Sequence, residues 1–167
     1  MTEAQNETLY AEEISSFRGR IYMLKAGREI PLRLSHSTDK WTWGFTPEND
    51  WIQAGGNKES PLFNFIFHSQ TEDRLHFNIF GTGRKATKKL GISLNGYLGL
   101  YKVAEVTDYW KLEPLAWTEK GLVCRWRDHQ GHEVKAIQDY PHRQPGKFFH
   151  LNVSEGTPHE FLVERID

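Results

Sequence analysis

The segment WRDHQGH combines side chains of the kinds that recognise sugars. Within seven residues it carries an aromatic ring, a carboxylate, an amide and two imidazoles, on Trp126, Asp128, His129, Gln130 and His132. An aromatic ring can stack on the apolar face of a pyranose while polar neighbours bind its hydroxyls. The next segment, DYPHRQPG, adds a second such cluster through Tyr140 and His142. The sequence therefore predicts a carbohydrate site here, and burial of the rings in the core is the competing interpretation.

A second cluster of candidate binding residues carries positive charge. The segment GTGRKATKK, residues 81–89, carries four cations within six residues, on Arg84, Lys85, Lys88 and Lys89. Such a group could hold a phosphate, a sulfated sugar or an acidic protein surface. Its Gly-Thr-Gly lacks the spacing and the strand-to-helix context of a phosphate loop. A solvated basic loop is the alternative interpretation.

Metal binding and catalysis have weaker support in the sequence. His129 and His132 lie three residues apart beside Asp128, but a divalent-metal site usually needs three ligands in fixed geometry. Cys124 falls within a predicted strand, and the sequence contains no Gly-x-Ser-x-Gly elbow. Carboxylates such as Asp108 and Glu113 could pair, as they could in any all-β domain. We therefore expect a non-catalytic protein with no metal and no cofactor.

Composition limits the possible partners and folds. The 167 residues are enough for one domain, and 21 Lys and Arg against 22 Asp and Glu give a net charge of -1. No global field draws such a chain to nucleic acid or to an anionic membrane. The single cysteine excludes an intramolecular disulfide. The chain has no signal-peptide pattern and no apolar run long enough to span a membrane, so we expect it in the cytoplasm or released without a signal peptide.

The elements that must position these side chains are predicted to be β-strands. Residues 1–16 form a tail or a short helix, and residues 17–167 form one all-β domain, in which runs rich in aromatic and β-branched residues alternate with Gly, Pro, Asn and Asp. The predicted strands lie near 20–26, 28–35, 40–46, 62–68, 74–80, 96–102, 109–115, 121–127, 132–138, 147–153 and 160–166.

An internal repeat is visible among these strands. The segment YLGLYKVAEVTDYWKLE aligns without a gap on FFHLNVSEGTPHEFLVE, and this alignment matches Trp110 with Phe161 at an offset of 51 residues (161 − 110). A third copy is predicted in IPLRLSHSTDKWTWGF, where Trp41 would match Trp110, with residues 51–61 as an insertion. One such unit leaves strand edges unpaired, whereas three units around an axis can close a barrel.

The repeat, with NGYLGLY followed by YWKLEP, resembles the fascin-like and lectin-like members of the β-trefoil superfamily over about residues 20–166. The resemblance implies a β-trefoil with pseudo-threefold strand-hairpin repeats. The Gln-x-Trp triplet of ricin-type lectins is absent. A calycin-like up-and-down barrel is the other fold considered, because KWTWG contains Trp43-Gly44, but it leaves the repeat unexplained.

The resemblance, together with the aromatic and polar segments, implies a lectin-like module that binds a glycan or glycoprotein. The alternative is a trefoil that binds a protein, like cytoskeleton-binding or protease-inhibiting trefoils, through loops 51–61 and 81–89. Neither alternative involves nucleic acid or a membrane span.

Overall fold

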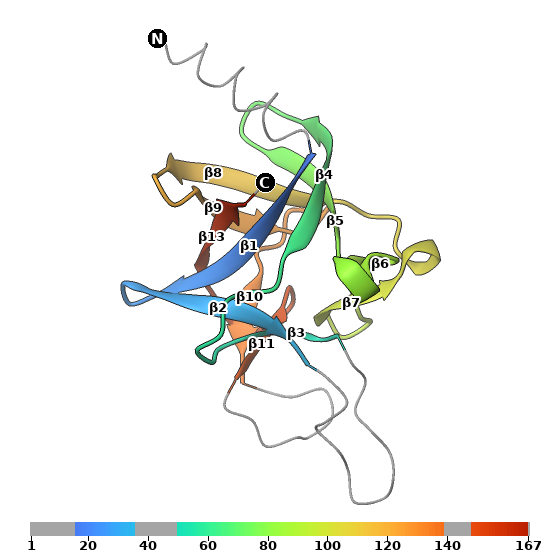
Figure 1. The fold of residues 1–167 in the computed structure, drawn as a ribbon, viewed down its shortest axis with the longest axis horizontal. Helices are drawn as coiled ribbons and strands as arrows, with labels where there is room; N and C mark the ends of the chain where they lie inside the picture. The colour runs from blue at the N-terminus through green and yellow to red at the C-terminus, as the bar shows by residue number, and fades with distance from the viewer. Residues whose placement is uncertain (1–15, 36–49, 139–147, 167) are drawn as a thin grey trace, which may run out of the picture.

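The computed structural model describes residues 16–35, 50–138 and 148–166, and these residues form an all-β fold (Figure 1). The strands are β1 (Ser16–Lys25), β2 (Arg28–Leu34), β3 (Ile52–Ala54), β4 (Phe63–Gln70), β5 (Leu75–Phe80), β6 (Lys88–Ile92), β7 (Leu98–Lys102), β8 (Trp110–Trp117), β9 (Leu122–Arg127), β10 (Lys135–Ile137), β11 (Phe149–Asn152), β12 (Thr157–Pro158) and β13 (Glu160–Arg165). Two short 3-10 helices, Gly83–Lys85 and Val103–Glu105, lie between strands, and the described residues contain no α-helix.

Six of the strands form a closed antiparallel barrel. The ring runs β1, β4, β5, β8, β9 and β13, and β13 pairs with β1 to close it. Closure leaves these strands without an exposed edge along the paired residues, which is the advantage of a barrel over an open sheet. In an up-and-down barrel, neighbouring strands are consecutive in the chain, whereas here the strands β2 and β3 lie in the chain between the neighbours β1 and β4.

The register of the ring repeats three times. Three of its interfaces contain one kind of pair: Gly19 with Phe63, Phe77 with Trp110 and Cys124 with Phe161. The other three contain a second kind of pair: Phe65 with Ile79, Leu112 with Trp126 and Val163 with Ile21. On each of the six strands, the residue that belongs to the second kind of pair lies two residues after the one that belongs to the first kind.

These repeated positions form the centre of the core. Strand residues alternate between the two faces of a sheet, so side chains two apart share the inner face. Phe63, Trp110 and Phe161 are all buried, and the ring of Trp126 lies 5.4 Å from that of Trp110 and 5.2 Å from that of Phe161. Phe17, from the start of β1, stacks on Phe65 with ring centroids 4.6 Å apart.

Hairpins alternate with the strands of the ring and lie against one another. The strands β2 and β3, β6 and β7, and β10 and β11 pair within their hairpins. Strand β3 also pairs with β11, and single bridges join Trp51 to Gly99 and Tyr97 to Asn152. In Figure 1 the hairpins gather at one end of the barrel, below and to the right of the ring.

Several sequence-based expectations need correction. Ser16, predicted to lie in the tail, begins β1, and the rest of that tail lies outside the described residues, as do the predicted strand 40–46 and Trp41. The third repeat was placed wrongly, because Phe63 of β4 occupies the ring position that had been given to Trp41. Residues 51–61 are not a simple insertion, since Trp51 is buried and Ile52–Ala54 form β3.

Candidate functional site

A cleft of about 440 Å³ opens beside the hairpin of β6 and β7. Its walls come from β6 and the turn after it, from Tyr101 of β7, from the segment that leads into β8, and from the turn that follows β9. The apolar part of the lining is formed by Leu90, Gly91, Ile92, Leu94, Val106 and Trp110. Leu94 is fully exposed, so this lining continues onto the molecular surface. The cleft therefore combines an apolar wall with access from solvent.

A carboxylate and an imidazole face each other in this cleft. Nδ1 of His129 lies 3.6 Å from Oδ2 of Asp108, and both residues line the cleft. Asp108 precedes β8 and His129 follows β9. These positions are brought together because Lys111 pairs with Arg127 in the antiparallel ladder. The Asp108 side chain is 56% exposed, so its carboxylate can accept hydrogen bonds from a ligand.

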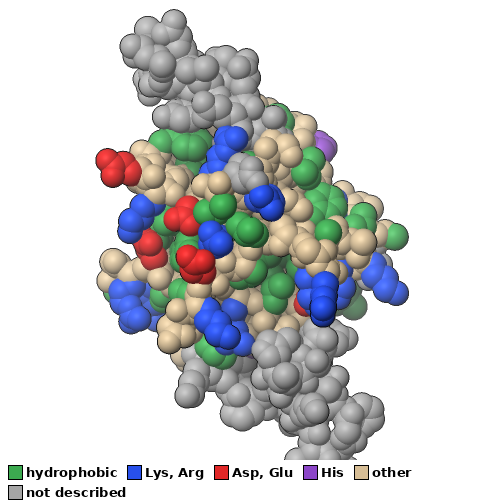
Figure 2. Space-filling model, in the orientation of Figure 1, with side chains coloured by type: hydrophobic (Ala, Val, Ile, Leu, Met, Phe, Trp, Pro, Cys, Tyr) green, Lys and Arg blue, Asp and Glu red, His purple; other side chains and the backbone are tan. Residues whose placement is uncertain are grey.

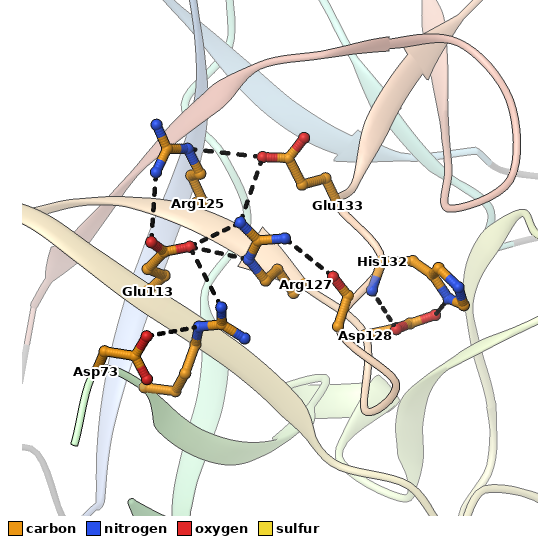
Figure 3. A network of polar contacts seen from close by, with 9 residues as sticks. Asp73, Glu113, Arg125, Arg127, Asp128, His132 and Glu133 are labelled. Atoms are coloured by element: carbon orange, nitrogen blue, oxygen red, sulfur yellow. Dashed lines mark hydrogen bonds and ion pairs between the residues drawn. The ribbon is translucent and has the colours of Figure 1, made fainter. Parts of the chain in front are cut away.

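Asp128 also lines the cleft, but its carboxylate is used within the turn. Oδ1 accepts hydrogen bonds from the backbone N–H groups of Gln130 and His132, both at 2.9 Å, and Nδ1 of His132 lies 3.0 Å from Oδ2 (Figure 3). Asp128 is buried, and Gly131 adopts a φ of 93°, which favours glycine. Asp128 therefore shapes the turn that presents His129.

The prediction for Trp126 was wrong. Its side chain is buried between Trp110 and Phe161, so its ring cannot stack on a sugar. The alternation of β9 explains the error: Leu122, Cys124 and Trp126 all point inward, whichever polar residues follow them.

The remaining residues of the predicted carbohydrate site fall in different places. Gln130 and His132 are exposed on the turn and do not line the cleft. Tyr140 and His142 lie outside the described residues. Of the predicted site, the structure thus brings Asp128 and His129 to the cleft.

Sequence reasoning missed the roles of Asp108 and Tyr109. Tyr109 lines the cleft, and its ring stacks with His68 and His76, at centroid distances of 4.6 and 4.7 Å. Ser69 Oγ lies 2.7 Å from Nδ1 of His68 and 2.8 Å from Nδ1 of His76. Burial lowers the pKa of His76 below its ordinary value. These contacts fix the Tyr109 ring at the edge of the cleft.

An ion-pair network supports the turn from the outer face of β8 and β9 (Figure 3). Nη2 and Nε of Arg127 donate to Glu113 at 2.7 and 2.9 Å, and Nη1 of Arg127 donates to the carbonyl of Gly131 at 2.9 Å. Burial alone would raise the pKa of Glu113, but the hydrogen bond and charge of Arg127, with Arg74 and Arg125, hold it below its usual range. The network therefore links the barrel wall to the turn carrying His129.

The threefold register allows the cleft to be compared with its counterparts. Asp108 lies two residues before Trp110, and His129 lies three residues after Trp126. The corresponding positions in the other repeats are His159 with Leu24, and Pro61 with Thr82.

Neither counterpart offers the same chemistry as the cleft. His159 and Leu24 line a second, more open cleft of about 380 Å³, where burial and the charge of Lys25 lower the pKa of His159. In the remaining repeat, Thr82 Oγ1 donates to the carbonyl of Leu62 at 2.9 Å, which ties the two segments together. Among these three equivalent pairs of positions, a carboxylate facing an imidazole therefore occurs once, at Asp108 and His129.

The four cations of segment 81–89 do not form a uniform solvated loop. Lys85 and Lys88 make ion pairs with the buried carboxylate of Asp50, and Arg84 is exposed. Lys89 is buried in β6, donates to the carbonyl of Val106 at 3.3 Å, and has a pKa lowered by burial. Lys89 is therefore not available at the surface, contrary to the prediction.

The described residues do not meet the requirements of a three-ligand metal site, a cysteine nucleophile or a membrane-spanning helix. Among residues 16–35, 50–138 and 148–166, no three His, Cys, Asp or Glu side chains lie close enough together to hold a metal ion. Cys124 is fully buried, which raises the pKa of its thiol far above the ordinary value, so it is no nucleophile. In the part of the chain that the structure describes, no helix is long and apolar enough to cross a membrane.

Compared with known proteins, the chain matches no family model, no curated protein and no solved structure.

Proposed function

We propose that the protein is a non-catalytic carbohydrate-binding module with a β-trefoil fold. The threefold register of the six-stranded ring supports the trefoil assignment, as do the three hairpins that alternate with its strands. On this assignment the repeats are β1 to β4, β5 to β8, and β9 to β13. A fold alone does not define a function, so the carbohydrate proposal rests on the cleft.

The observation that carries the proposal is the pairing of Asp108 and His129 against an apolar wall. Saccharide sites combine an apolar surface for the C–H face of the ring with a few placed polar groups for its hydroxyls. The exposed Asp108 carboxylate can accept two hydroxyl hydrogens, and His129 can donate or accept one. Ile92, Leu94 and Val106 provide the apolar surface.

The non-catalytic part of the proposal follows from the chemistry in the cleft. Among the described residues that line it, Ser93 is the one side-chain hydroxyl outside the tyrosines, and its Oγ accepts the backbone N–H of Tyr97 at 3.1 Å. Asp128, the second carboxylate, is held by its own turn. The cleft therefore offers recognition groups, and its described lining contains neither an activated nucleophile nor a pair of free carboxylates.

A glycan-array screen tests this proposal, with wild-type protein beside Asp108→Asn and His129→Ala. Both changes affect partly exposed side chains, so the fold should persist, and we expect glycan binding to fall at least about tenfold because hydrogen bonds to the ligand are lost. Asp73→Asn is the matched control, since Asp73 is an exposed carboxylate that does not line the cleft.

Two results would contradict the proposal in different ways. A folded wild-type protein that binds no glycan would reject carbohydrate binding. Glycan binding that survives both cleft substitutions would retain the function but reject this site.

A further inference from the structure

The hairpin of β6 and β7 and the 3-10 helix before it concentrate more positive charge than the carboxylate in contact with them neutralises. Lys88 of β6 lies directly opposite Lys102 of β7 in the antiparallel ladder, and like charges in such positions repel. Arg84 and Lys85 come from the 3-10 helix that precedes β6. Figure 2 shows Lys and Arg side chains gathered on the side of the molecule where Figure 1 places this hairpin.

A buried carboxylate holds two of these cations in place. Nζ of Lys85 lies 2.7 Å from Oδ1 of Asp50, and Nζ of Lys88 lies 2.5 Å from Oδ2 of the same group. The Asp50 side chain is 1% exposed, whereas those of the two lysines are 37% and 35% exposed. Asp50 therefore lies beneath the ammonium groups and fixes them, while each keeps N–H donors that can face solvent.

The charge balance of this surface is positive. Arg84, Lys85, Lys88 and Lys102 supply four positive charges, and Asp50 is the described carboxylate in ion-pair contact with them, so three positive charges remain (4 − 1). The chain as a whole has a net charge of -1, so this excess is local. A local excess of cations, two of which are held in place by Asp50, favours binding of an anionic group at this surface.

We propose that Arg84, Lys85, Lys88 and Lys102 form a binding site for a tetrahedral oxyanion ester, the group shared by sulfated glycans and phosphorylated ligands. Several ammonium and guanidinium donors can share the oxygens of one such group. Binding would also relieve the repulsion between Lys88 and Lys102. This site is separate from the cleft, so it goes beyond the proposed function and does not depend on it.

Affinity measurements with three polymers test the site: dextran sulfate, inorganic polyphosphate and uncharged dextran. The test variant is Arg84→Gln/Lys102→Gln, which leaves Lys85 and Lys88 on Asp50 and so preserves the buried ion pairs. We expect the wild type to bind a charged polymer in a salt-dependent way, and the variant to bind it about tenfold more weakly with a shallower salt dependence.

The matched control is Arg28→Gln/Lys120→Gln, which removes the same charge from the start of β2, beside its turn with β1, and from the turn between β8 and β9, where Nζ of Lys120 lies 2.7 Å from Oε2 of Glu29. Both turns lie on the side of the molecule opposite to β6 and β7 in Figure 1. Preference for dextran sulfate would identify a sulfated glycan as the source of the anion, and preference for polyphosphate a phosphate ester. The proposal is overturned if neither charged polymer binds better than dextran, or if the control loses as much affinity as the test variant.

Discussion

At the scale of single residues, Asp50 is a charged group in a position where charge is costly. Its carboxylate is buried, and its φ of 74° lies in the left-handed region that Asp and Asn tolerate better than most residues. Its backbone N–H donates to Ser35, and its carbonyl accepts from Leu100, both at 2.9 Å. Asp50 thus joins three segments of the chain. Its buried negative charge is tolerated because Lys85 and Lys88 neutralise it.

Removing both lysine charges should therefore destabilise the protein strongly. We expect Lys85→Met/Lys88→Met to lower the free energy of unfolding by about 3–5 kcal/mol, because it leaves a buried carboxylate without an ion pair. Asp50→Asn is the control: it tolerates the same φ and leaves two lysines that can turn to solvent, so its cost should be smaller. Equilibrium unfolding in urea measures both, and a larger loss in Asp50→Asn would contradict this account.

A second single residue, His76, makes the free energy of unfolding depend on pH. Its pKa in the folded protein is lowered from 6.5 by burial and by the nearby charge of Lys111. As the pH falls below 6.5, the unfolded chain takes up a proton that the folded protein resists. The free energy of unfolding should therefore decrease as the pH falls from 6.5 through the lower pKa of the folded state.

The variant His76→Phe tests this linkage, because it keeps a ring beside Tyr109 but cannot titrate. Urea unfolding at pH values above and below 6.5 should show a smaller pH dependence in the variant than in the wild type. Some dependence should remain, since burial also lowers the pKa of His159. An unchanged pH dependence would show that His76 does not contribute.

At the scale of elements, equivalent strands of the ring should contribute similarly to stability. Phe63, Trp110 and Phe161 occupy matching places on β4, β8 and β13 and are all buried. Substitution of each by alanine should cost about 3–5 kcal/mol, as large-to-small changes in a core do.

Trp117 on the same strand as Trp110 provides the matched control for this prediction. It is 40% exposed, so Trp117→Ala should cost much less than Trp110→Ala in the same denaturation experiment. Equal losses at the two tryptophans would show that burial in the ring does not set the cost.

The strands of the ring were predictable because their inner faces alternate clearly. Phe63 and Phe65, like Trp110 and Leu112, recur every second residue, which is typical of a half-buried strand. The hairpin strands β3 and β6 gave no such signal: all three residues of β3 are buried, and β6 contains two lysines and Gly91. Their strand structure depends on partners distant in the chain, such as β11 for β3.

The candidate site was only partly predictable for a related reason. Asp128 and His129 lie in a segment whose composition indicated binding, and they do line the cleft. Asp108 joins them through the pairing of β8 with β9, which a local pattern does not specify. Trp126 was misassigned because its neighbours are polar, although its position in the alternation of β9 directs it into the core.

At the scale of the whole molecule, the three repeats share a frame but differ in their surface chemistry. The ring positions are filled by large apolar groups in most cases, whereas the positions around the cleft change from Asp108 and His129 to His159 and Leu24. The core thus constrains all three repeats, whereas the side chains at equivalent surface positions differ between them.

Closure of the ring between β1 and β13 also determines when the protein can fold during its synthesis. Met23 pairs with Phe161, so 138 residues separate them (161 − 23). At roughly 5–20 residues per second, a ribosome needs about 7–28 s to make that length of chain. Throughout this time one side of β1 has no strand to pair with, which makes the nascent chain a natural client for chaperones that shield unpaired strands.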